Sequence, residues 1–147
     1  MDKQIQMGTV SHGTMRNEDL IPSFAAELAY YTGDEEWAIL FGEIEDMETS
    51  DNYDWDSDRA QEVLFELFDA LDGLSPAYCY FGENEGDGSD YGFWICRDSI
   101  EEDCHYGELA KVSDMSESGA DTGMVLHVND HGNCSLYCDG KEVWSIV

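Results

Sequence analysis

Apolar residues recur with a helical period through the first half of the chain and predict helices there. Residues 14–33 form the first expected helix, with cap-type residues and acids near its start and Gly33 at its end. A second helix is expected to begin at the cap residue Asp34. Its apolar positions follow the i, i+3, i+4, i+7 spacing of one helix face: Trp37, Leu40, Phe41 and Ile44. The pattern stops in the acidic stretch 45–56, which is predicted to be a loop.

A third helix has the clearest pattern of the chain. Ser57 or Asp58 is its expected cap, and Gly73 ends it. At about 100° per residue, its apolar side chains cover one side of the helix: Ala60, Val63, Leu64, Leu67, Phe68 and Leu71. Carboxylates occupy the opposite side, and Phe65 lies among them rather than in the apolar stripe.

After residue 76 the apolar period becomes that of strands. The predicted strands are 78–81, 91–95, 107–112, 124–128, 135–138 and 142–147. The first two flank a Gly/Asp/Ser loop, which is typical of a hairpin. Residues 129–133 are a strong turn sequence between two later strands. Residues 113–123 are expected to be a linker.

Helices followed by meandering strands indicate an α+β fold. We expect a single domain over residues 1–147, in which the helices of an acidic part, 14–73, pack on one face of an antiparallel sheet formed by 76–147. Residues 1–13 are expected to be a short lead-in. No apolar run approaches the ~18 residues of a membrane span, and the start lacks the apolar stretch of a signal peptide. These features predict a cytoplasmic protein.

The formal net charge of −28 changes the interpretation most. It results from 34 Asp and Glu against six Lys and Arg. A small domain needs a net charge of only about 2–8 for solubility, and self-repulsion destabilises a compact chain. The excess therefore indicates a function outside the fold, most simply the binding of a strongly basic protein. Nucleic acid and anionic membranes are disfavoured as direct ligands, because phosphate binding depends on Lys and Arg, of which this chain has only six.

Half of this charge lies between Asp34 and Asp72, where 15 acids face a single base, Arg59. Acids four apart on a helix are separated by about 6 Å of rise, which is comparable to the separation of neighbouring phosphates along DNA. We therefore expect these carboxylates to replace phosphates in a nucleic-acid-binding groove, with two aromatic residues as anchors. The predicted partner-binding residues are Glu43, Asp46, Asp51, Asp54, Trp55, Asp56, Asp58, Glu62, Phe65, Glu66, Asp69 and Asp72. The alternative is a solvated helix face that contacts no partner.

Other origins of the acidity lead to different expectations. Disorder is disfavoured, because 42% of the residues are hydrophobic and 12% are aromatic. A halophilic cytoplasm, to which proteins adapt with excess surface charge, stays open. So does an acidic protein whose charge has no specific function.

Two loops hold carboxylates that could suggest calcium. With Asp54 as the first position of an EF-hand loop, Arg59 stands where Gly is required and Phe65 where Glu is required. The EF-hand is therefore excluded. The loop 83–90 could form a weak calcium site, but a plain hairpin loop is the favoured interpretation.

Zinc and nucleophilic catalysis are also disfavoured. The zinc-type residues are His127, His131, Cys134 and Cys138, whose spacing matches neither a paired C-x-x-C nor a helical H-x-x-H motif. The five cysteines are expected to be reduced thiols in a cytosolic protein. The chain has no G-x-S-x-G, phosphate-loop or dinucleotide motif. We therefore predict a protein that is not an enzyme and has no metal or cofactor.

Two segments resemble parts of small proteins of phages and other mobile elements. They are residues 80–94, YFGENEGDGSDYGFW, and residues 128–133, VNDHGN. The size and acidity of the chain also resemble those of DNA-mimicking inhibitors that mobile elements use against restriction and CRISPR systems. This resemblance implies a phage protein that acts in the cytoplasm of the host cell, and it carries no residue roles.

The resulting hypothesis is a non-enzymatic inhibitor of the anti-CRISPR or anti-restriction type. Its expected partner is a basic nucleic-acid-binding protein, either a CRISPR effector or a restriction enzyme, and the chain itself is expected to be a monomer. The alternatives are a small metal-dependent hydrolase and an acidic regulatory binder of another basic protein.

Overall fold

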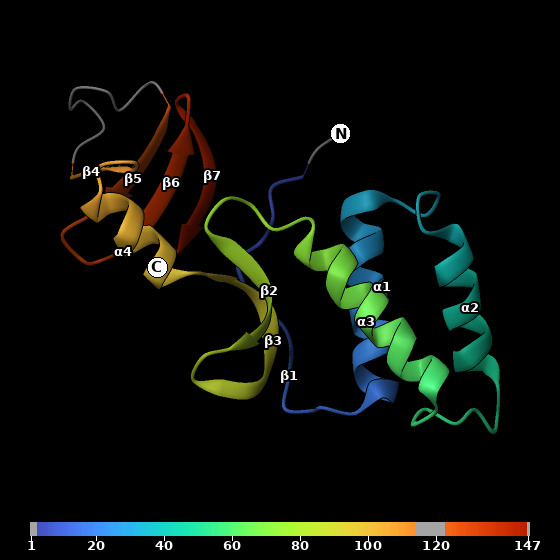
Figure 1. Ribbon diagram of the computed structural model, residues 1–147. Helices are drawn as coiled ribbons and strands as arrows, with labels where there is room; N and C mark the ends of the chain where they lie inside the picture. Colours follow the sequence, from blue (N-terminus) through green and yellow to red (C-terminus); the bar gives the residue numbers. More distant parts are fainter. Residues whose placement is uncertain (1–2, 114–122, 147) are drawn as a thin grey trace. The chain divides into compact units, whose positions relative to one another are not determined.

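The computed structural model describes residues 3–113 and 123–146, in which three helices follow a first strand and most of the strands come later in the chain (Figure 1). Four helices and two sheets in this part confirm the α+β class. Most of the expected linker lies outside the described residues. No described helix has the length and apolar character needed to cross a membrane. The elements fall into two compact units.

The first unit consists of residues 8–75 and 81–93 together with the N-terminal residues up to 3. Its elements are β1 (Gly8–His12), α1 (Asn17–Thr32), α2 (Ala38–Thr49), α3 (Asp58–Asp72) and most of β2 (Cys79–Asn84) and β3 (Asp87–Ile95). The strands form a sheet in the order β1-β3-β2. The expected hairpin is thus confirmed as β2 and β3, with strands that extend further into the loop than predicted.

Strand β1 replaces the lead-in expected at the N-terminus. Its sequence contains a single strongly apolar residue, Val10, so no alternating pattern marks it as a strand. The antiparallel pairing with β3 depends on Gly92, because a Cβ at this buried position would lie only 2.0 Å from the Gly8 carbonyl oxygen. The close approach of the two strands therefore requires glycine.

The three predicted helices are confirmed, although α2 has different ends. It extends into the acidic stretch that was predicted to be a loop, because Met47 lies on the same buried side as Leu40 and Ile44. Trp37, not Asp34, occupies its N-cap position. The helix therefore begins later and ends later than its sequence pattern predicted.

Helix α3 agrees with its sequence pattern at both ends. The Ser57 Oγ accepts a hydrogen bond from the Ala60 N–H at 3.2 Å, which caps the first turn, and Gly73 follows the last residue. Its buried side chains are Ala60, Val63, Leu64, Leu67 and Leu71. Phe65 is 58% exposed, as expected for a residue outside the apolar stripe.

Aromatic rings form the centre of the core of the first unit. Phe24 of α1 is fully buried, and its ring makes edge contacts with Phe68, Phe81 and Tyr91 at centroid distances of 5.1, 5.1 and 5.7 Å. Helix α1 packs against α2, α3 and β1. It is therefore the central helix of this unit, and it supports α2 and α3, the two helices of the acidic segment 34–72.

The second unit consists of residues 4–7, 76–80, 94–113 and 123–146. Its elements are α4 (Arg97–His105), β4 (Ala110–Val112), β5 (Met124–Val128), β6 (Cys134–Cys138) and β7 (Lys141–Ile146). The strands form a sheet in the order β4-β5-β6-β7, in which β4 is parallel to β5 and the other neighbours are antiparallel. The strands of the chain thus form two sheets, one of them mixed, instead of the one antiparallel sheet expected.

Helix α4 covers one face of the second sheet and was not predicted (Figure 1). Ile100 is its only buried residue, so its sequence has no apolar stripe. This helix packs with Trp144, Leu126 and Leu136 of the sheet. The fully buried Trp144 indole donates a hydrogen bond to the carbonyl oxygen of Ala77 at 2.9 Å, which satisfies its polar nitrogen.

Candidate functional site

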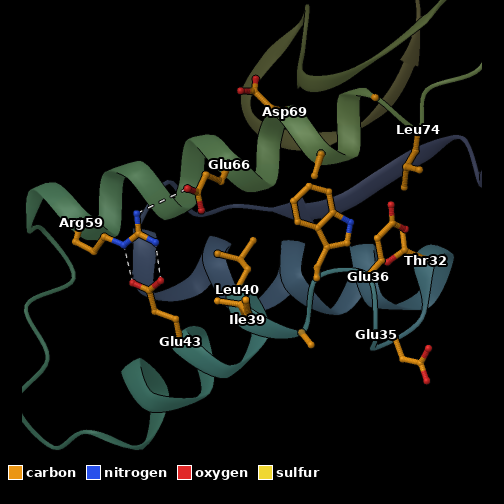
Figure 2. A pocket seen from close by; sticks show the side chains of 14 residues that line it. Thr32, Glu35, Glu36, Ile39, Leu40, Glu43, Arg59, Glu66, Asp69 and Leu74 are labelled. Carbon is orange, nitrogen blue, oxygen red and sulfur yellow. Dashed lines mark hydrogen bonds and ion pairs between the residues drawn. The ribbon is translucent and has the colours of Figure 1, made fainter.

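A groove with a volume of about 810 Å³ lies between α2 and α3 in the first unit (Figure 2). We refer to it as the α2–α3 groove. Its carboxylates come from the segment before α2, from α2 itself and from α3: Glu35, Glu36, Glu43, Glu66 and Asp69. Apolar side chains lie between them, and Ile39 and Leu40 are near the middle of the groove in Figure 2.

The Arg59 guanidinium joins α2 and α3 at one end of this groove. Its Nε and Nη2 donate hydrogen bonds to the two carboxylate oxygens of Glu43 at 2.6 and 2.5 Å. Its Nη1 donates to Glu62 at 3.1 Å and lies 3.7 Å from a Glu66 oxygen. The hydrogen bond from Arg59 lowers the pKa of Glu43, and the carboxylates raise the pKa of Arg59. Because one cation faces three carboxylates, the cluster keeps a net negative charge.

A smaller hollow of about 500 Å³ lies beside the groove, at the end of α2 and the start of α3. Glu43, Asp46 and Asp54 line it together with Tyr53 and Arg59. Two of the predicted carboxylates, Asp46 and Asp54, are therefore brought close to Glu43 by the fold. This grouping extends the negative surface from the groove to the loop between the helices.

Some predicted binding residues also stabilise the fold. The Asp72 carboxylate accepts a hydrogen bond from the Phe81 N–H at 3.0 Å. The Asp54 carboxylate accepts one from the Asp56 N–H at 3.0 Å, which closes a local turn. These bonds use part of the acceptor capacity of both carboxylates. We therefore expect Asp72 and Asp54 to contribute less to a partner contact than the other predicted carboxylates.

The predicted aromatic anchors differ in exposure. Phe65 is well exposed on α3, whereas Trp55 is half-buried. The Trp55 ring makes an edge contact with Tyr53 at a centroid distance of 5.1 Å, and its backbone carbonyl accepts a hydrogen bond from Asn17 at 2.9 Å. Trp55 therefore has a packing role of its own, and Phe65 is the better placed of the two anchors.

The remaining predicted carboxylates are exposed, and their binding role stays a prediction. They lie in the loop before α3 and along the exposed side of that helix, where Glu66 and Asp69 also line the groove: Asp51, Asp56, Asp58, Glu62, Glu66 and Asp69. Asp58 is in the first turn of α3, where a negative charge interacts favourably with the helix dipole.

Most of the groove residues were not among the predicted site residues, and the missed ones include the carboxylates Glu35 and Glu36 and the base Arg59. Trp37 was assigned to the buried stripe of its helix, and Ile39 and Leu74 were given no role. Ile39 is 93% exposed. Ile39 lies outside the apolar stripe of α2, as Phe65 lies outside the stripe of α3. This position could have identified it from the sequence.

The carboxylates of the loop 83–90 form hydrogen bonds within the first unit. Asp87 accepts from the backbone and the hydroxyl of Ser89, which lower its pKa, and its other oxygen lies 3.0 Å from the His12 Nε2. Asp90 accepts from the Thr9 hydroxyl at 2.7 Å. The loop thus connects β3 to β1, a role that the sequence did not indicate.

The zinc-type residues are spread over the hairpin of the second unit. His127 is on β5 opposite Ser135, His131 is in the turn, and Cys134 and Cys138 are at the two ends of β6. Among the described residues, no group of three or more His, Cys, Asp or Glu is arranged to hold a metal ion. All five cysteines are free thiols, as expected.

Comparison with protein-family models, with curated proteins and with solved structures finds no match for this chain.

The Glu43–Arg59 pair predicts a specific dependence of stability on pH. A carboxylate whose pKa is lower in the folded chain stabilises the fold above its ordinary pKa of 4.5, and this contribution is lost as the pH falls through its folded-state pKa. Glu43→Gln should therefore lower the free energy of unfolding at pH 7, and this difference from the wild type should shrink as the pH falls below 4.5. Urea unfolding followed by circular dichroism at several pH values measures it.

Glu48→Gln is the matched control, because it removes the same charge from an exposed position of the same helix. Its expected effect at neutral pH is neutral or slightly stabilising, since it reduces repulsion. Equal effects of the two variants at all pH values would contradict the role given to the Glu43–Arg59 pair.

Proposed function

We propose that this protein is a non-enzymatic inhibitor that occupies the nucleic-acid-binding groove of a basic protein. The proposed target is a CRISPR effector or a restriction enzyme in the cytoplasm of a host cell. The contact surface is the segment from α2 to α3, whose carboxylates would pair with the Lys and Arg that otherwise hold phosphates. The mechanism is competition, so it requires no catalytic residue and no cofactor.

One observation carries the proposal: α3 buries its apolar side and exposes its whole acidic side. Carboxylates spaced along one helix face repel one another and destabilise the helix. A cationic groove would reduce this repulsion and so stabilise the helix. The only base of the segment, Arg59, already forms a bidentate pair with Glu43. Arg59 also contacts Glu62 and Glu66. Because this single base faces 15 acids in residues 34–72, most of the negative charge is still left for a partner.

The proposal also explains how recognition would begin. Long-range attraction between a negative surface and a positive groove accelerates association, and dissolved salt screens it over about 8 Å at physiological ionic strength. Binding should therefore weaken steeply as salt is added, and most of this loss should be in the association rate.

The direct test is displacement of DNA from a defined target. A purified CRISPR effector and a purified restriction endonuclease are each bound to fluorescently labelled target duplex, and the protein is added while fluorescence anisotropy is followed. We expect release of the duplex from at least one of them at low ionic strength, and much less release at high ionic strength. Failure to release the duplex from either target, or release that is indifferent to salt, would contradict the proposal.

A polyglutamate of equal net charge is the control for nonspecific effects of charge. It should release little duplex at the concentration at which the protein is effective, because its carboxylates have no fixed arrangement. If the two polyanions are equally effective, charge alone accounts for the result. Binding to a basic protein without release of its nucleic acid would instead favour an acidic regulatory binder.

A further inference from the structure

Apolar side chains that reach solvent line the α2–α3 groove. Ile39 is 93% exposed, and Trp37 and Leu74 are half-buried beside it. Exposed apolar surface that is rimmed by polar groups is typical of an interaction site. An apolar side chain from another molecule could be buried here against Ile39 and Trp37, whereas Phe65 is the exposed large apolar residue of α3.

The rim of the groove is negative on both sides. Five carboxylates and one guanidinium are among its described lining residues, and the guanidinium of Arg59 is already paired with Glu43. Figure 2 shows Glu66 and Glu43 at the Arg59 end, with Glu36 at the opposite end and Asp69 further along α3. An occupant that brings positive charge to both ends of the groove would match this arrangement.

We infer that the groove receives an apolar side chain flanked by Lys or Arg, supplied by the basic target protein. This inference rests on the proposed function and adds to it a second type of contact. The outer carboxylates of α3 would supply steering, and the groove would supply the buried anchor that carries most binding energy at an interface. A second copy of this chain is disfavoured as the occupant, because both copies would carry the same charge of −28.

Two synthetic peptides of equal length and equal positive charge test the inference without knowledge of the target. One carries leucine between its lysines at helical spacing, and the other carries serine at the same positions. Because burial of one leucine side chain corresponds to about tenfold or more in affinity, we expect the leucine peptide to bind at least about tenfold more tightly. Its binding should shift the indole N–H signal of Trp37 in the NMR spectrum.

Ile39→Ser should remove most of this preference, and Ile39→Leu should keep it. Neither change should unfold the protein, since the Ile39 side chain is almost fully exposed. Met15→Ser is the matched control, because Met15 is a 63% exposed apolar residue that is not among the groove residues. It should leave the affinities of both peptides unchanged.

Equal affinity of the two peptides, an Ile39→Ser variant that behaves as the wild type, or no binding of either peptide would each overturn the groove inference. The proposed function is judged separately by DNA displacement and its dependence on salt. A protein that displaces DNA but does not prefer the leucine peptide would therefore keep the proposed function and lose the anchor. A protein that prefers the leucine peptide but does not displace DNA would keep the anchor and lose the proposed function.

Discussion

Reversal of Glu62, Glu66 and Asp69 to Lys is expected to reduce the affinity for the target by about 100-fold or more. The estimate follows because close charge pairs at an interface commonly contribute tenfold or more each. Helix α3 should stay folded, since its apolar stripe is on the other side, and Arg59 keeps its bidentate pair with Glu43. The measurement is DNA displacement from the CRISPR effector or restriction endonuclease, with circular dichroism as the check of folding.

The matched control changes the same number of charges in the second unit. Glu101, Glu102 and Glu108 are exposed, so their reversal to Lys raises the net charge by the same amount outside the proposed surface. We expect this control to displace DNA nearly as well as the wild type. If the α3 variant binds as tightly as the wild type, α3 is not the contact surface. Equal losses in both variants would mean that total charge, and not its position, determines binding.

Phe24→Ala is expected to have the largest effect on stability. The ring of Phe24 is fully buried and contacts three other aromatic rings, so its removal leaves a cavity at the centre of the first unit. Truncation of a buried phenylalanine typically lowers the free energy of unfolding by about 3–5 kcal/mol. That is a large part of the stability of a small domain. Urea unfolding followed by circular dichroism measures the change.

Phe65→Ala provides the comparison, because it is the same substitution on an exposed position of α3. Its effect on stability should be within about 0.5 kcal/mol. Should Phe24→Ala fail to fold, Phe24→Leu should give a folded protein with an intermediate loss. A loss below about 1 kcal/mol for Phe24→Ala would contradict the central position of this ring in the core.

The triple reversal on α3 and the Phe24→Ala variant test different sides of the first unit: the first tests binding, and the second tests stability. The Phe24 cluster holds α1 against α3 and the sheet, and the carboxylates extend from the opposite side of α3. If a variant loses affinity for the target without losing stability, the replaced residue belongs to the contact surface. For this reason Phe65, which is exposed and aromatic, is the informative residue to replace in both assays.

The sequence alone determined the elements whose signals are local. Ser57, the apolar stripe and Gly73 fixed α3 at both ends, because capping and helical period depend on residues within a few turns of one another. The α+β class followed from the change of period near residue 76. The hairpin of β2 and β3 also followed, since its turn residues and flanking strands are adjacent in sequence.

Elements that depend on distant partners were missed or misplaced. The strand β1 has one strongly apolar residue and is held by pairing with β3, about 80 residues away in the chain. Helix α4 has one buried residue and is positioned by the sheet that it covers. The parallel pairing of β4 with β5 places two segments side by side that flank a long connection, and alternation within a strand does not specify its partner.

The candidate site divides in the same way. Sequence determined that the carboxylates of α3 lie opposite its apolar stripe, because the helical period fixes the angle between them. Only the tertiary structure decided that Arg59 binds Glu43, 16 residues away, and that α2 and α3 enclose a groove with Ile39 exposed in it. The period of a helix sets which side each residue faces, but the distance between two helices depends on what both of them pack against, here α1.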